Sequence, residues 1–202
     1  MPPLATILDN LARAQTGLLR AADAVPAEHW ATCPVEGRWS AGEVVAHLIT
    51  IERSILRGAD KLLQHPPRQV PFYKRFHLPM VVVERRFIRR KSPLPVEPQL
   101  LREKEVMLAE LREVRGRTLA FIDETKGRDL SAYCRSQAFL GTLNVYEWLQ
   151  LIASHEIRHT KQMKEIAGGL PKVVASLQSR QFYRFDSHSL PSQLIAKTKE
   201  KL

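Results

Sequence analysis

The stretch that decides the fold is Asn144–Gly169, N-V-Y-E-W-L-Q-L-I-A-S-H-E-I-R-H-T-K-Q-M-K-E-I-A-G-G. It opens with Asn144 followed three residues later by Glu147, a spacing typical of a helix N-cap. It ends at Gly168-Gly169, shortly before Pro171, where a helix is expected to stop. Between these signals, apolar residues recur at helical spacing: Val145, Trp148, Leu149, Ile152, Met163 and Ile166. The stretch therefore predicts one long helix.

Two histidines lie on the apolar face of this predicted helix. His155 and His159 are four residues apart, so their side chains share one side of a helix. An imidazole is costly to bury without a partner, and one metal cation satisfies two adjacent imidazoles at once. Such a pair is a common ligand arrangement, although two inward histidines can also be hydrogen-bonded core residues.

A third histidine occupies a similar position on a second predicted helix. Ser40-Ala41-Gly42-Glu43 matches the capping box, in which the serine and glutamate each bond the other's backbone amide. We predict a helix from Ser40 to about Arg57, with Gly58 as its left-handed stop. His47 falls among its apolar positions. Alone it would more often be a hydrogen-bonded core residue, but two helices that both direct imidazoles inward predict a three-histidine metal site.

The rest of the chain predicts an all-α four-helix bundle. Two further amphipathic helices are expected over Leu4–Ala24 and Pro98–Thr125, and no comparable strand pattern is found. Residues 59–97 form a long, proline-rich, basic connection between the second and third long helices, typical of a bundle in which these are not antiparallel neighbours. Within it, Leu78–Arg90 suits a short helix or a strand. We expect a bundle domain over residues 1–170 and an irregular C-terminal extension over 171–202.

Composition limits the partners and the compartment. The formal charge is +10, but no nucleic-acid-binding motif accompanies it, so we expect no nucleic-acid partner. No apolar stretch approaches the length of a membrane span. The first residues lack the features of a secretory signal, so we expect a cytoplasmic protein. Cys33 and Cys134 lie far apart and form no cysteine metal motif.

The five residues His155–His159 also match the H-E-x-x-H motif of zinc proteases, in which the glutamate is the general base. The longer form of that motif requires Gly and His where this chain has Gln162 and Glu165. No strand-bearing lobe for a peptide substrate is predicted either. We therefore expect Glu156 to face a neighbouring helix or solvent, and we do not favour a protease.

Two stretches together resemble a known family. Gly37–Leu48, with Trp39-Ser40, Glu43 and His47-Leu48, resembles the W-S-x-x-E-hydrophobic-x-x-H-L signature of the DinB-like superfamily. Gly141–Leu149, followed by His155–His159 and Gln162, resembles the final helix of that family. The resemblance is strong over about 37–57 and 139–166, weak over the first and third helices, and absent from the tail.

The resemblance implies a four-helix bundle with a long crossover and a metal centre. His47, His155 and His159 would be the ligands of one divalent ion, with Zn, Ni, Fe, Mn and Co all acceptable to imidazole. It also implies a homodimer. Family members with known activities include metal-dependent transferases that use low-molecular-weight thiols such as bacillithiol or mycothiol, and related isomerases.

Three protein ligands leave a coordination position open, which is typical of a reactive site. We therefore expect a metal-dependent enzyme acting on a small molecule, either a thiol-dependent S-transferase or a hydrolase. In the transferase hypothesis, the basic connection would attract an acidic thiol. The alternative is a non-catalytic metal- or ligand-binding bundle acting in stress response, which the lack of an evident general base favours.

Four side chains near the motifs are expected to have supporting roles. Gln162 lies one turn beyond His159, and it is the candidate for orienting a ligand or a bound water. Glu43 is interpreted as the cap partner of Ser40. Trp39 and Trp148 are expected to be packing residues.

Overall fold

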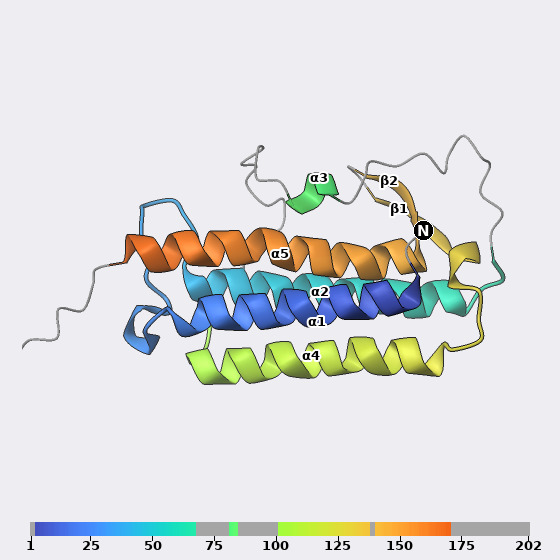
Figure 1. Cartoon of the computed structure of the whole chain (residues 1–202), viewed down its shortest axis with the longest axis horizontal. Helices are drawn as coiled ribbons and strands as arrows, with labels where there is room; N and C mark the ends of the chain where they lie inside the picture. Colours follow the sequence, from blue (N-terminus) through green and yellow to red (C-terminus); the bar gives the residue numbers. More distant parts are fainter. Residues whose placement is uncertain (1–2, 68–80, 85–100, 138–139, 171–202) are drawn as a thin grey trace, which may run out of the picture. The chain divides into compact units, whose positions relative to one another are not determined.

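Four long helices pack as a bundle in the computed structural model (Figure 1). They are α1 (Leu4–Asp23), α2 (Ala41–Leu63), α4 (Lys104–Glu124) and α5 (Val145–Gly169). The short elements are η1 (Ala27–His29), α3 (Val81–Glu84), η4 (Leu130–Ala132), β1 (Cys134–Gln137) and β2 (Gly141–Asn144). The structure describes residues 3–67, 81–84, 101–137 and 140–170. The four-helix bundle predicted from the sequence is thus confirmed.

The long connection follows from the directions of the helices. α2 and α4 run the same way and lie side by side, while α1 and α5 run the opposite way (Figure 1). After α2 the chain must therefore return along the bundle before α4 begins. A helix of 21 residues is roughly 30 Å long, so a short loop cannot make this return. α5 packs against both α1 and α2.

Both helices that carry the histidines begin with a complete capping box. Ser40 Oγ accepts from the Glu43 amide, and the Glu43 carboxylate accepts from the Ser40 amide at 2.7 Å. Asn144 and Glu147 form the same reciprocal pair at the start of α5. These contacts satisfy amides that the first helical turn leaves without partners. The roles predicted for Glu43 and Asn144 are confirmed.

The predicted end of α2 at Gly58 is wrong, because the helix continues to Leu63. Gly58 lies inside the helix, where a Cβ atom would overlap the guanidinium of Arg135. The same guanidinium lies 4.5 Å from the ring centroid of Trp148. The glycine therefore makes room for a side chain from β1 and does not terminate the helix.

Two further differences concern the second half of the chain. β1 and β2 form an antiparallel hairpin in which Cys134 pairs with Asn144 and Gln137 with Gly141. This hairpin was not predicted, because neither four-residue strand alternates cleanly between buried and exposed positions. α4 begins at Lys104 and not at Pro98, since residues 101–103 are not helical.

Some expectations fall on parts of the chain that the structure does not describe. Of the predicted element over Leu78–Arg90, Val81–Glu84 are helical and the remainder lies outside the described residues. The C-terminal extension, 171–202, also lies outside them, so its separation from the bundle domain stays a prediction. In the described part of the chain, no helix is long and apolar enough to cross a membrane.

A polar layer divides the core of the bundle at mid-length. One apolar cluster includes Leu18, Val44 and Met163, and the other includes Leu11, Phe121 and Leu149. The buried polar residues between the clusters come from three helices: His47, Glu52, Arg115, Thr118, Glu156 and His159. Buried polar groups are tolerated only when they have hydrogen-bond or ionic partners. Each of these side chains is therefore expected to bind a partner inside the core.

Candidate metal centre

The structure brings the three predicted histidines together at one point between α2 and α5. His47 Nε2 lies 3.4 Å from His155 Nε2, and His159 Nε2 lies 3.1 Å from the same atom. The ring planes are inclined to one another by 62–87°, with centroids 4.6–5.1 Å apart. The three Nε2 atoms therefore converge, while the rings avoid one another.

This arrangement suits a single metal ion. Metal–nitrogen bonds of about 2.0–2.1 Å at tetrahedral angles put two ligand nitrogens roughly 3.3–3.4 Å apart. The Nε2 separations of 3.1 and 3.4 Å are close to that spacing. Hydrogen bonds alone would not explain the convergence, because a neutral imidazole carries one N–H and three such rings cannot all pair at one point. The donor set fits a divalent cation.

Burial keeps the three imidazoles neutral, as metal ligation requires. His47 and His159 are only 8% and 6% exposed, and His155 is half-buried. Burial lowers the pKa of His47 from 6.5 to about 4. Burial, aided by the charges of His47 and Arg158, lowers the pKa of His155 to about 3. The pKa of His159 is also well below 6.5, chiefly through burial.

These pKa values predict that His47 and His155 each destabilise the metal-free protein as the pH falls. Above pH 6.5 the histidines are neutral in both the folded and the unfolded chain. Between pH 6.5 and about 4, His47 and His155 bind protons in the unfolded chain but not in the folded chain. Each of them should therefore lower the free energy of unfolding by about 1 kcal/mol between pH 7 and 5.5, whereas Glu156, whose pKa burial raises to about 7, acts in the opposite direction. Chelator-treated protein, unfolded in urea at several pH values, tests this. An H47Q variant with an unchanged pH slope would contradict it.

Gln162 hydrogen bonds to one of the three histidines. Its Oε1 lies 3.0 Å from His159 Nδ1, and because an amide oxygen only accepts, the imidazole must donate. The proton is therefore on Nδ1, and the lone pair on Nε2 points at the site. Metal-binding histidines commonly have such a partner on the second nitrogen. The geometry agrees with the role predicted for Gln162, which remains part of the functional proposal.

Removing this oxygen should weaken metal binding without unfolding the protein. We expect Q162L to lower the affinity for Zn²⁺ about 10–100-fold, the usual effect of losing a partner that hydrogen bonds to a ligand. Q162E keeps an acceptor at the same place and should retain most of the affinity. Competition with a chromogenic chelator measures both variants. Equal losses of Zn²⁺ affinity in Q162L and Q162E would show that the hydrogen-bond acceptor at position 162 does not determine metal binding.

Trp39 belongs to the centre, although it was expected only to pack. Its indole is stacked on His159, with centroids 6.0 Å apart and planes within 8°. The indole also contacts the His47 imidazole, with ring centroids 4.9 Å apart and planes inclined by 59°. The residue was missed because Trp39 precedes the α2 N-cap, so helical periodicity gives no direction for its side chain. Trp148 does pack in the apolar cluster near the start of α5.

Glu156 does not serve the histidines, as the protease motif would require. It is 2% exposed, and its carboxylate accepts from Arg115 of α4 at 2.9 Å. Arg115 also binds Glu52 of α2, at 2.9 Å, and the Leu11 carbonyl of α1, at 2.7 Å. The expectation that Glu156 faces a neighbouring helix is confirmed, and the network joins all four helices.

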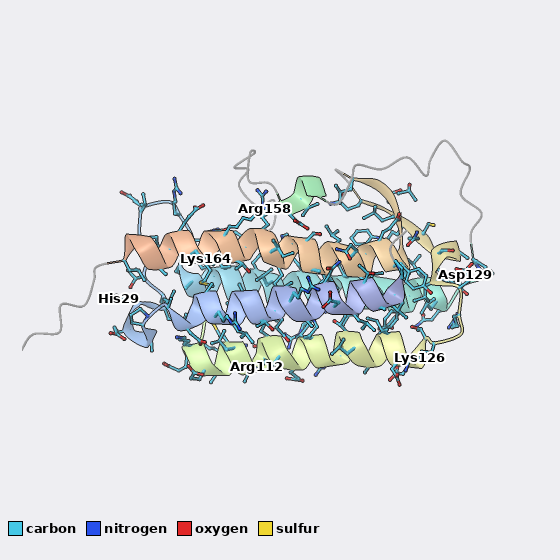
Figure 2. All side chains as sticks on the ribbon, viewed as in Figure 1. His29, Arg112, Lys126, Asp129, Arg158 and Lys164 are labelled. Carbon is cyan, nitrogen blue, oxygen red and sulfur yellow. The ribbon has the colours of Figure 1, made fainter. Side chains whose placement is uncertain are left out.

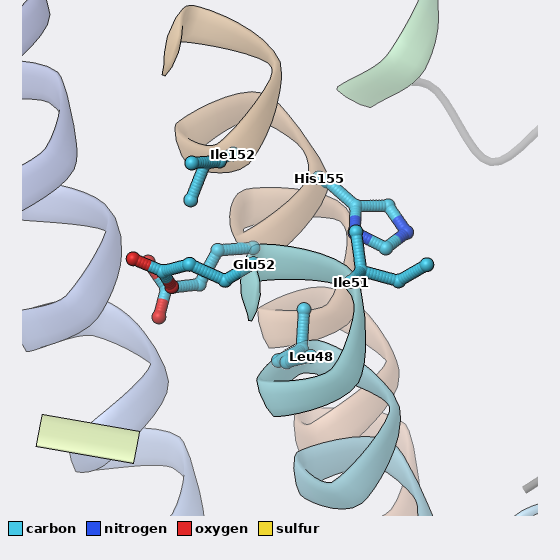
Figure 3. A pocket seen from close by; sticks show the side chains of 6 residues that line it. Leu48, Ile51, Glu52, Ile152 and His155 are labelled. Atoms are coloured by element: carbon cyan, nitrogen blue, oxygen red, sulfur yellow. The ribbon is translucent and has the colours of Figure 1, made fainter. Parts of the chain in front are cut away.

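Glu52 and Glu156 of the ion network line a small cavity between α2 and α5 together with His155. Figure 3 shows Glu52 pointing toward α1 and His155 pointing the other way. The cavity measures about 10 Å³, which is room for about one water molecule. The carboxylates of Glu52 and Glu156 hydrogen bond to Arg115 on the side of the cavity away from His155.

The long connection contacts α5 close to the histidines. The main-chain oxygens of Val83 and Glu84, in α3, accept from Arg158 and Lys161 at 3.4 and 3.0 Å. The Glu84 carboxylate accepts from the buried Ser154 hydroxyl. Arg158 is labelled on this side of α5 in Figure 2. α3 is thus bound along the turns that carry His155 and His159. Arg85, Arg86, Arg89 and Arg90 of the basic connection lie outside the described residues.

Comparisons with known proteins agree with this architecture. The family model of the DinB superfamily matches residues 10–163 of the chain. The uncharacterized protein YuaE of Bacillus subtilis (strain 168) is 32% identical over 134 residues, which cover 66% of this chain and 80% of YuaE. No solved structure gives a significant match. The matched region of the family model includes all three histidines and Gln162.

Proposed function

The chain belongs to the DinB superfamily, and from that premise we propose that it is a metal-dependent enzyme acting on small molecules. The observation that carries the proposal is the convergence of three neutral imidazoles on one point. We propose that His47, His155 and His159 hold one divalent ion. The reaction is a thiol-dependent S-transfer or a hydrolysis.

The donor set supports a reactive centre rather than a structural one. Structural zinc sites are closed by four protein ligands, whereas catalytic sites keep a position open. Among the described residues, no carboxylate or cysteine joins the three histidines in a metal-binding group. A small molecule can therefore occupy the remaining position.

The side chains of this chain perform three tasks in the proposed reaction. The imidazoles bind the ion, Gln162 sets the tautomer of His159, and Trp39 covers one side of the ligand rings. The chemistry that a divalent ion supplies at such a site is to lower the pKa of a water or thiol that it binds. In a transferase, the sulfur of the thiol forms a bond to an electrophilic carbon while the leaving group departs.

The proposed substrate is a low-molecular-weight thiol with an electrophilic partner. The charge of the long connection supports this choice, because residues 85–91 carry five basic side chains, Arg85, Arg86, Arg89, Arg90 and Lys91. Positive charge beside a site raises the local concentration of anionic substrates. We further propose that the protein acts in the cytoplasm as a homodimer, without a nucleic-acid partner.

The proposal is tested by assaying metal-loaded protein with monochlorobimane and a panel of low-molecular-weight thiols. Conjugation forms a carbon–sulfur bond, breaks the carbon–chlorine bond, and releases chloride and a proton. We expect turnover that a chelator removes and that is lost in H47A. The exposed His65 provides the matched control, so H65A should retain full activity. Turnover that persists in H47A would refute catalysis at this centre.

A second candidate is a non-catalytic bundle that binds a metal or ligand in stress response. It is favoured by the ion network, in which the buried carboxylates of Glu52 and Glu156 bind Arg115 and not the three histidines. Inactivity with every thiol and with ester and amide substrates, in protein that holds its metal, would favour this candidate.

A further inference from the structure

Trp39 is the aromatic residue that touches ligands from both metal-bearing helices. It contacts His47 of α2 and His159 of α5. We infer that Trp39 is a positioning residue of the metal centre, whose indole holds the planes of His47 and His159 so that both Nε2 atoms meet at one point. This inference rests on the proposed metal centre and goes beyond its ligand set.

The case is clearest for His159. An imidazole turns about two side-chain bonds, so both its plane and the direction of its edge must be held. The hydrogen bond to Gln162 holds the Nδ1 edge. The stacked indole, with its plane within 8° of the imidazole, holds the plane. Offset stacking of two aromatic rings is favourable beyond the burial of their surface.

His47 depends on Trp39 even more. Among the described residues its hydrogen-bond contact is with His155, through Nε2, so no acceptor holds its second nitrogen as Gln162 holds His159. Side chains on a helix lean toward its N-terminus, which brings His47 toward the residues just before α2. At that place the centroid of the Trp39 indole lies 4.9 Å from the centroid of the His47 imidazole. The indole is thus a ring contact that restrains the His47 plane from outside the three-histidine group.

Trp39 can restrain other rings because it is itself held. It directly precedes Ser40, whose capping box ties the backbone to the first turn of α2. It packs against the apolar cluster that includes Val44 and Met163. The preceding loop contains Gly37 with φ +74°, at the third position of a turn closed by a bond from Arg38 to Val35. A positive φ there favours glycine, so the backbone that leads into Trp39 also has a defined conformation.

The test uses Co²⁺, whose visible absorption reports the coordination geometry without any substrate. We expect W39L to bind Co²⁺ about 10–100-fold more weakly than the unmodified protein, the range seen when ligand-orienting partners are lost. Its absorption at saturating Co²⁺ should differ in shape as well as in affinity. W39F keeps an aromatic face and should recover most of the affinity, to within about threefold.

A matched control separates positioning from general packing. W148F changes a tryptophan in the other apolar cluster and should leave both Co²⁺ affinity and absorption unchanged. Equal affinity and identical spectra in W39L and the unmodified protein would overturn the role of Trp39 while leaving the metal centre intact. Failure of the unmodified protein to bind Co²⁺ would instead overturn the metal centre, and this inference with it.

Discussion

Replacement of His159 by alanine is expected to abolish stable metal binding. The variant loses one of three ligand nitrogens, and the Nε2 atoms of His47 and His155 that remain lie 3.4 Å apart. It also loses the ring on which Trp39 stacks. We expect the affinity for Zn²⁺ or Ni²⁺ to fall by more than about 100-fold, beyond the effect of losing a residue that merely orients a ligand.

Thermal unfolding measures this loss independently of any activity. A metal that binds only the folded state raises Tm in proportion to the logarithm of its concentration. The unmodified protein should show such a rise, H159A should show none, and H65A, changed at an exposed histidine, should behave like the unmodified protein. Circular dichroism establishes that H159A remains helical. Equal metal-induced increases in all three proteins would place the metal elsewhere.

The second large effect is expected at Arg115, which holds the polar layer together. Its guanidinium binds the carboxylates of Glu52 and Glu156, all three side chains being almost fully buried. R115A would leave two buried carboxylates without their counter-ion, a change that typically costs about 3–5 kcal/mol. For a chain of this size, Tm should fall by roughly 6–20 °C. Calorimetry or urea unfolding measures the change.

The same helix provides the matched control. Arg117 forms an exposed ion pair with Glu113, and such pairs contribute little, so R117A should change the free energy of unfolding by less than about 1 kcal/mol. A triple variant, R115M with E52Q and E156Q, removes the buried charges and should be more stable than R115A alone. An R115A variant as stable as R117A would show that the network does not hold the helices.

The features predictable from the sequence were those that leave a local, periodic signal. The capping boxes at Ser40 and Asn144 marked the starts of two helices, because their residue types and spacing follow from the geometry of a first turn. His47, His155 and His159 were identifiable because polar residues interrupted apolar faces. Residues 59–97 indicated a crossover through their length alone.

The features that were missed depend on contacts between distant segments. Gly58 was interpreted as a helix end, whereas it accommodates Arg135 from the hairpin. Glu156 was expected to face a neighbouring helix or solvent, but its partners Arg115 and, through it, Glu52 could not be named from sequence spacing. Trp39 lies outside any helix, so periodicity gave no direction for its ring. Each of these positions is decided by packing that only the folded chain brings together.

The most direct test of the central claim is the metal content of the protein, purified without a histidine tag and measured by elemental analysis. The structure predicts about one divalent ion per chain, held by His47, His155 and His159, and none in a variant with all three changed to alanine. Unmodified protein that contains no metal, and takes up none from Zn²⁺, Ni²⁺, Fe²⁺, Mn²⁺ or Co²⁺ on reconstitution, would contradict the metal centre.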